Sequence, residues 1–142
     1  MAVKPEGVVA LIAQIREKVN RFILQELDYH GIQGLAPSHG DILATLFQET
    51  VLPMGELARM IDRDKSTVTT LVDKLIALDY VEKVKDDPDS RVTLVKLTEQ
   101  GKALKPDFEE ISARLLSKVY EGISAEEQQG LVALLSRIRN NF

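Results

Sequence analysis

The sequence predicts a mainly α-helical fold that carries one small β-hairpin. Apolar residues recur at three- and four-residue steps near both ends of the chain, which is typical of long amphipathic helices. Between them lie two shorter helical segments and two Val- and Leu-rich segments that flank an acidic turn. The chain has 142 residues, of which 44% are hydrophobic and 28% charged, which is an ordinary composition for a globular protein. No segment of the sequence is recognisable as a linker between domains. We therefore expect one intertwined domain.

The first helix is expected over residues 7 to about 29. Its apolar stripe is long for a chain of this size and needs a partner surface. The stripe consists of Val8, Leu11, Ile12, Ile15, Val19, Phe22, Ile23 and Leu27. The segment HGIQGLAP then breaks the pattern, and Ser38 with Asp41 resembles a capping box that opens a short helix through Phe47.

The middle of the chain, GELARMIDRDKSTVTTLVDKL, reads as two short helices joined by a tight polar turn. Asp64 is placed to cap the second helix by accepting from the amide of Ser66 or Thr67. Val68 and Leu71 begin an apolar face at helical spacing. This order matches the helix-turn-helix plan, and an ordinary helical hairpin is the alternative.

YVEKVK and RVTLVKL are short, rich in Val and Leu, and separated by DDPDS, so they predict a two-stranded hairpin with a polar tip. A hairpin that follows a helix-turn-helix is a wing. The predicted fold class is therefore mainly α with a small β-hairpin wing: a winged helix-turn-helix plus a helical dimerisation region.

Two further helices are expected after the hairpin. Thr98 is a plausible N-cap of a long helix, which Pro106 should kink about two turns in. Ser124 and Glu127 form a second capping box that opens the last helix. Leu131, Leu134, Leu135 and Ile138 share one side of it.

Composition excludes several classes of function. Cysteine is absent, and His30 and His39 are the only nitrogen ligands, so a metal site is not expected. No arrangement of nucleophile, base and acid is recognisable, and we expect neither enzymatic activity nor a cofactor. The N-terminus lacks the pattern of a signal peptide and no segment approaches about 20 apolar residues, so a cytoplasmic protein without a membrane partner is expected.

Three segments resemble the MarR family of winged helix-turn-helix transcriptional regulators. LAPSHGDILATL resembles the family's Leu-Thr-x-x-Gln entry into the second helix, and GELARMIDRDKSTVTTLVDKLIALDYVEK resembles its reading helices. DPDSRVTLVKLTEQG resembles its wing and its Leu-Thr-x-x-Gly junction, with Asp89 and Arg91 in the Asp-x-Arg positions. The resemblance implies a dimerisation helix in 1–34, a DNA-binding region in 35–100 and further dimerisation helices in 101–142.

The resemblance also implies that Arg91 enters the minor groove of DNA, aimed by Asp89. Hydroxyls of the reading helix could contact phosphates or base edges, and lysines could anchor phosphates, although capping and solvation give the same pattern. Many members of the family carry basic residues where this chain has Thr70 and Ser90. The complete set of candidate DNA-binding residues is Lys65, Ser66, Thr67, Thr69, Thr70, Lys74, Lys83, Lys85, Asp89, Ser90 and Arg91.

We expect a homodimer, because three long helices leave more apolar surface than the DNA-binding region, 35–100, can cover. Its DNA partner would be a pseudo-palindromic operator. By resemblance, a small aromatic or anionic effector would release a repressor, and Tyr29, His30 and His39 are candidate pocket residues unless they are structural.

The charge balance keeps an alternative function open. Residues 54–100 hold eight basic and ten acidic side chains, and the whole chain has a formal net charge of −4. Phosphate neutralisation supplies most non-specific DNA affinity. A winged-helix protein-interaction module with little DNA affinity is therefore the second hypothesis.

Overall fold

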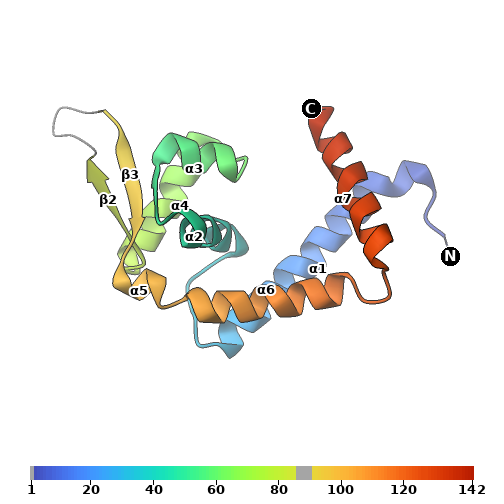
Figure 1. The fold of residues 1–142 in the computed structure, drawn as a ribbon, viewed down its shortest axis with the longest axis horizontal. Helices are drawn as coiled ribbons and strands as arrows, with labels where there is room; N and C mark the ends of the chain where they lie inside the picture. Colours follow the sequence, from blue (N-terminus) through green and yellow to red (C-terminus); the bar gives the residue numbers. More distant parts are fainter. Residues whose placement is uncertain (1, 86–90) are drawn as a thin grey trace.

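The computed structural model describes residues 2–85 and 91–142. Figure 1 shows a winged region on one side, made by α2, α3, α4 and the strands, and the helices α1, α6 and α7 extending away from it. The helices are α1 (Val8–Tyr29), α2 (Pro37–Glu49), α3 (Met54–Met60), α4 (Lys65–Ala77), α5 (Glu99–Lys102), α6 (Lys105–Val119) and α7 (Ala125–Asn140). The strands are β1 (Val51–Pro53), β2 (Val81–Lys85) and β3 (Thr93–Leu97). The predicted fold class is confirmed.

α1 forms as one helix, preceded by a 3₁₀ turn at Pro5–Gly7. Only its C-terminal part is buried, at Glu26 and Leu27. Glu26 forms an ion pair with Arg114 of α6, which ties the two long helices together. The apolar stripe of the N-terminal half remains exposed.

The start of α2 differs from the expected capping box. The N-cap is Ala36, and Pro37 takes the first helical position, where its fixed φ suits the helix and its missing N–H costs nothing. An alanine methyl cannot accept a hydrogen bond. His39 instead accepts from the backbone N–H of Ala36 at 2.8 Å through Nδ1, so His39, and not Ser38 with Asp41, caps this end. Burial lowers the pKa of His39, and the nearby charge of Lys74 lowers it further.

The helix-turn-helix forms as predicted. Asp64 caps α4 by accepting from the N–H of Thr67 at 2.7 Å, and this hydrogen bond holds the pKa of Asp64 below its ordinary value. Val68, Val72 and Leu75 turn inward and are fully buried. The outward side of α4 is therefore left to its polar residues.

The hairpin of β2 and β3 forms with Val81 opposite Leu97 and Lys85 opposite Thr93. A third strand, β1, pairs antiparallel with the other side of β3, so the strand order is β1-β3-β2. β1 was not predicted from the sequence, because three residues that end in proline show no measurable alternation. β1 connects α2 directly to α3 and so anchors the wing to the helix-turn-helix.

A short junction follows β3. The Thr98 hydroxyl donates to the carbonyl of Asp79 at 2.5 Å and accepts from the N–H of Gly101 at 3.0 Å, which confirms Thr98 as an N-cap. The N–H of Thr98 also donates to the carbonyl of Tyr80 at 3.1 Å. These bonds fasten the exit of the wing to the end of α4.

The expected long helix after Thr98 is in fact two helices. α5 ends at Lys102, and α6 begins at Lys105. Pro106 lies in the first turn of α6, where its missing N–H leaves no intrahelical bond unmade, so it starts a helix and does not kink one.

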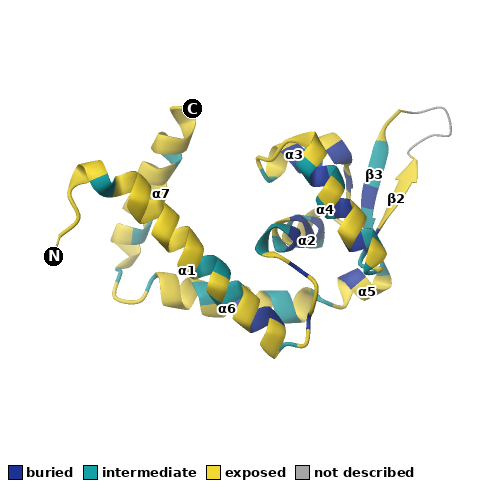
Figure 2. Ribbon diagram, turned by 180° about the vertical axis from the view of Figure 1, so that it is seen from behind, coloured by how far each residue is buried: buried dark blue, intermediate teal, exposed yellow. Residues whose placement is uncertain are grey.

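The last helix begins at the predicted capping box. Ser124 accepts from the N–H of Glu127 at 3.1 Å, and Glu127 accepts from the N–H of Ser124 at 2.9 Å. These hydrogen bonds lower the pKa of Glu127. α7 contains no buried residue, as Figure 2 shows.

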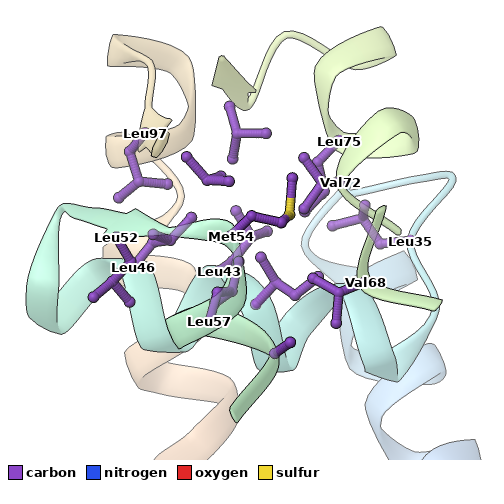
Figure 3. Packing of buried hydrophobic residues seen from close by; sticks show 14 of the residues in the cluster. Leu35, Leu43, Leu46, Leu52, Met54, Leu57, Val68, Val72, Leu75 and Leu97 are labelled. Carbon is purple, nitrogen blue, oxygen red and sulfur yellow. The ribbon is translucent and has the colours of Figure 1, made fainter. Parts of the chain in front are cut away.

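The core lies between α2, α3, α4 and β3, as Figures 2 and 3 show. Leu43, Leu46, Leu57, Val72 and Leu75 meet there. Among the buried apolar residues of the described chain, only Leu27, Ile32 and Ile111 fall outside 35–97. Residues 35–97, which we call the reading unit, thus have a core of their own.

Within residues 2–85 and 91–142, no helix has both the length and the apolar character required to cross a membrane. The same residues contain no cluster of three or more potential metal ligands.

We expect Gly101→Ala to lower the free energy of unfolding by about 3 kcal/mol or more, because an added Cβ would lie 2.0 Å from the carbonyl oxygen of Tyr80. Urea denaturation followed by circular dichroism measures the change. Gly55→Ala is the matched control: its Cβ would meet nothing within 4 Å, and the helix should gain about 0.5 to 1 kcal/mol. Equal stability of both variants would contradict the close approach.

Candidate nucleic-acid interface

A groove of about 470 Å³ lies between the start of α4 and the wing. Its walls come from the β1–α3 connection, from α4 and from both wing strands. The lining residues are Pro53, Met54, Gly55, Lys65, Thr69, Lys83, Arg91, Val92 and Thr93. Three of these residues are cationic and none is acidic, so positive charge is concentrated here in a region with more acidic than basic residues.

Three separate elements bring these cations together. Lys65 is the first residue of α4, directly after the Asp64 cap. Lys83 is in the centre of β2, opposite Val95 of β3. Arg91 lies two residues before β3 begins, and its side chain is exposed. The pairing of the wing strands and the cap of α4 therefore set the spacing of the three charges.

The charge of Lys83 is partly engaged within the protein. Its Nζ lies 2.9 Å from Oδ1 of Asp73, which projects from α4. Asp73 is 60% exposed, so the pair contributes little to stability. It does hold β2 beside the reading helix and reduces the positive charge that a phosphate would meet.

The hydroxyls of α4 are directed to the backbone of their own helix. Thr69 donates to the carbonyl of Lys65 at 2.8 Å, and Thr70 donates to that of Ser66 at 3.2 Å. Each hydroxyl proton is thereby used, and the oxygens remain as acceptors. These hydroxyl oxygens can therefore accept hydrogen bonds from base amino groups, whereas phosphate oxygens offer them no donor.

The other described candidates for DNA binding do not line the groove. Lys74 lies beside Gly34, in the loop between α1 and α2, and Lys85 is exposed at the end of β2. Ser66 is exposed and Thr67 half-buried on the first turn of α4. Asp89 and Ser90 lie outside the described residues, so their proposed roles at the wing tip remain expectations.

The three residues expected in an effector pocket lie in different surroundings. Tyr29 is 81% exposed. Nδ1 of His30 lies 2.8 Å from Oδ1 of Asp107, which links the end of α1 to α6. His39 is buried as the cap of α2. None of the three lines the cavity that lies between α1, α2 and α6.

That cavity, of about 510 Å³, lies between α1, α2 and α6. Its apolar walls include Leu27, Phe47 and Phe108, and its charged residues are Asp41, Lys105 and Glu109. Neither these residues as a pocket lining nor Asp73 as a partner of Lys83 was predicted from the sequence, because each fits an ordinary helix pattern. Only the packing of three helices separated in sequence brings the cavity residues together.

A helix-turn-helix whose second helix shares a cationic groove with a β-hairpin wing is typical of a winged-helix DNA-binding protein. Residues 35–93 match the sequence model of the MarR family. The HTH-type transcriptional regulator SarZ of Staphylococcus aureus (strain MRSA252) is 32% identical over 102 residues, which cover 71% of this chain and 68% of SarZ. The chain belongs to the MarR family. It is therefore a DNA-binding transcriptional regulator, and not an enzyme.

Solved structures share the fold. A mutant MarR of E. coli in complex with operator DNA has a TM-score of 0.80 and 20% identity, with 96% of this chain and 99% of that chain covered. The organohalide-sensing regulator RdhR bound to 2,4-dichlorophenol has a TM-score of 0.84 and 23% identity, with coverage of 99% and 82%.

We expect Asp73→Asn to strengthen binding to any duplex DNA, because it leaves Lys83 available to a phosphate. The slope of log affinity against log salt should steepen by about 0.9, the value of one added phosphate contact. Fluorescence anisotropy over a salt series measures it. Adding Lys83→Gln to this variant should remove the gain, and a gain that persisted would show that Lys83 is not its source.

Proposed function

We propose that this chain is a homodimeric, sequence-specific regulator, a repressor that a small-molecule effector releases from DNA. The observation that carries the proposal is the convergence of Lys65, Lys83 and Arg91 on one groove. Their positions suit a duplex that receives α4 in its major groove and the wing along its backbone. Arg91 would reach the adjacent minor groove, where negative potential attracts a guanidinium.

The exposed apolar surface supports a homodimer. Leu11, Ile12 and Ile15 of α1 are 38%, 41% and 51% exposed. Leu134 and Leu135 of α7 are 57% and 43% exposed. Figure 1 shows that these helices extend away from the reading unit, so a second copy can cover them without blocking the groove. Two-fold symmetry then presents two reading helices to a pseudo-palindromic operator.

Residues 1–34 and 101–142 are proposed as the dimerisation parts and 35–100 as the DNA-binding part. The cavity between α1, α2 and α6 lies where these parts meet, and its volume is typical of a site for a small molecule. An effector there would favour one spacing of the two reading helices and so shift the population of DNA-competent dimers. Such a regulator would act in the cytoplasm, where its DNA is.

A second function is favoured by one observation. Asp73 stands on the exposed side of the reading helix and is paired with Lys83. A carboxylate there repels phosphates and would suit a basic protein partner. The alternative is therefore a winged-helix module that binds proteins and has little DNA affinity.

The test is binding to the intergenic DNA beside the protein's own gene, measured by fluorescence anisotropy at two salt concentrations with random DNA as competitor. Selective binding that weakens with salt supports the regulator. Absence of selectivity at low salt would favour the protein-interaction module.

We expect Arg91→Ala to weaken operator binding more than tenfold, because it removes a guanidinium from a narrow groove (about 1.4 kcal/mol per tenfold). The same anisotropy titration measures this loss. Arg21→Ala is the matched control, since Arg21 is paired with Glu17 on α1, far along the chain from the wing, and its loss should leave affinity unchanged. Full affinity of the Arg91 variant would remove the wing from the mechanism.

We expect Leu11→Asp to reduce the dimer to monomers in sedimentation velocity, because an unpaired charge would be buried in the interface. Ala10→Asp introduces the same charge on the exposed side of α1 opposite the apolar stripe and should leave the sedimentation coefficient unchanged. A Leu11 variant that stays dimeric would place the interface elsewhere.

A further inference from the structure

The cavity between α1, α2 and α6 has an apolar body. Phe47 of α2 and Phe108 of α6 meet edge to face, with ring centroids 5.5 Å apart and an interplanar angle of 73°. Leu27 of α1 and Ile111 of α6 add aliphatic surface. Walls of this kind exclude water around a hydrophobic ligand and offer aromatic faces to a cation.

The lining of the cavity carries more negative than positive charge. Two carboxylates, Asp41 and Glu109, stand against one ammonium, Lys105. Lys105 Nζ lies 3.9 Å from Oε1 of Glu109, so this single cation is shared with its neighbour on α6. The carboxylate of Asp41 makes no hydrogen bond or ion pair with any described residue.

The surroundings of Asp41 make an opposite charge favourable there. Asp41 is an exposed residue at the edge of the cavity. Partial desolvation raises the pKa of its carboxyl, and the charges of Arg16 and Arg63 oppose that rise with smaller effect. Neither arginine lines the cavity, and Arg63 donates to the hydroxyl of Ser38 at 3.2 Å. An anion entering the cavity would therefore meet two carboxylates before either guanidinium, whereas a cation would complete the pairing of Asp41.

We propose that this cavity binds a hydrophobic aromatic ligand that carries a protonated amine, with the carboxylate of Asp41 as its counter-ion. The inference rests on the proposed effector function and replaces the aromatic or anionic effector expected from the sequence with a cationic one. The aromatic part of the ligand packs between Phe47 and Leu27, and the ammonium faces α2.

Two naphthalene probes of nearly equal size and opposite charge test the proposal. 2-Naphthylmethylamine is a cation and 2-naphthoate an anion at pH 7.5. Because the chain has no tryptophan, probe fluorescence anisotropy reports binding to the intact 142-residue chain directly. We expect the amine to bind at least tenfold more tightly than the carboxylate, in line with a charge-assisted contact in a partly dry site.

Substitutions locate the source of this preference. Asp41→Asn should abolish it by weakening amine binding about tenfold while leaving 2-naphthoate unweakened. Asp28→Asn is the matched control, because Asp28 is exposed on α1 and does not line the cavity, and it should change nothing. Ala44→Trp fills the cavity from α2 and should weaken both probes.

Three results would overturn the proposal: equal or tighter binding of 2-naphthoate, an unchanged preference in Asp41→Asn, or no binding of either probe at millimolar concentration. DNA binding of the same samples is measured separately. Loss of DNA binding with the amine preference intact would reject the proposed function alone. Intact DNA binding without the preference would reject the ligand proposal alone.

Discussion

The rest of the structure depends on one close approach, that of Gly101 to the backbone carbonyl of Tyr80. Because no Cβ fits between them, the turn after β3 can lie directly on the end of α4. Thr98 then reaches the carbonyl of Asp79 and caps α5 in the same arrangement. The wing is thereby fixed beside the reading helix at its base, and the chain is directed into α6. This explains the Leu-Thr-x-x-Gly motif in physical terms. The Thr98 hydroxyl both donates to Asp79 and caps α5, and Gly101 has no side chain to block the approach to Tyr80.

The groove resolves the apparent conflict between an acidic protein and a nucleic-acid partner. Net charge acts over long distances and affects the approach of DNA, whereas bound phosphates meet the local charges. Local charge is set by which residues the fold places side by side. Lys65, Lys83 and Arg91 come from separate elements and share the groove, while Asp73 withdraws part of the charge of Lys83. We expect this internal ion pair to moderate the affinity for phosphates.

How far the sequence predicted the structure depended on whether the signal was local. The caps at Asp64, Thr98 and Ser124 and the apolar stripes were predicted correctly, since each depends on neighbours within one or two helical turns. Ser38 was wrongly chosen as a cap because Pro37 shifts the helix start and because a histidine can accept from an amide as a carboxylate does. The strand β1 and the cavity could not be predicted, since both exist only through pairing between distant segments. Lys65, Lys83 and Arg91 were each named as DNA-binding candidates from the sequence, but their convergence on one groove and the pairing of Lys83 with Asp73 required the fold.

The two faces of α2 show how a ligand in the cavity could affect DNA binding. Gly40, Asp41, Ala44, Phe47 and Gln48 face the cavity, while Ile42, Leu43 and Leu46 are fully buried in the core against α4 and β3. A helix is stiff along its length and its core side is close-packed, so α2 responds to a ligand as one body. A shift of α2 relative to α1 and α6 would carry α4 and the wing with it, and would leave the groove itself intact. A ligand bound at Asp41 would accordingly change the distance between the two α4 helices of a dimer. The arrangement of α4 and the wing within each protomer would stay the same.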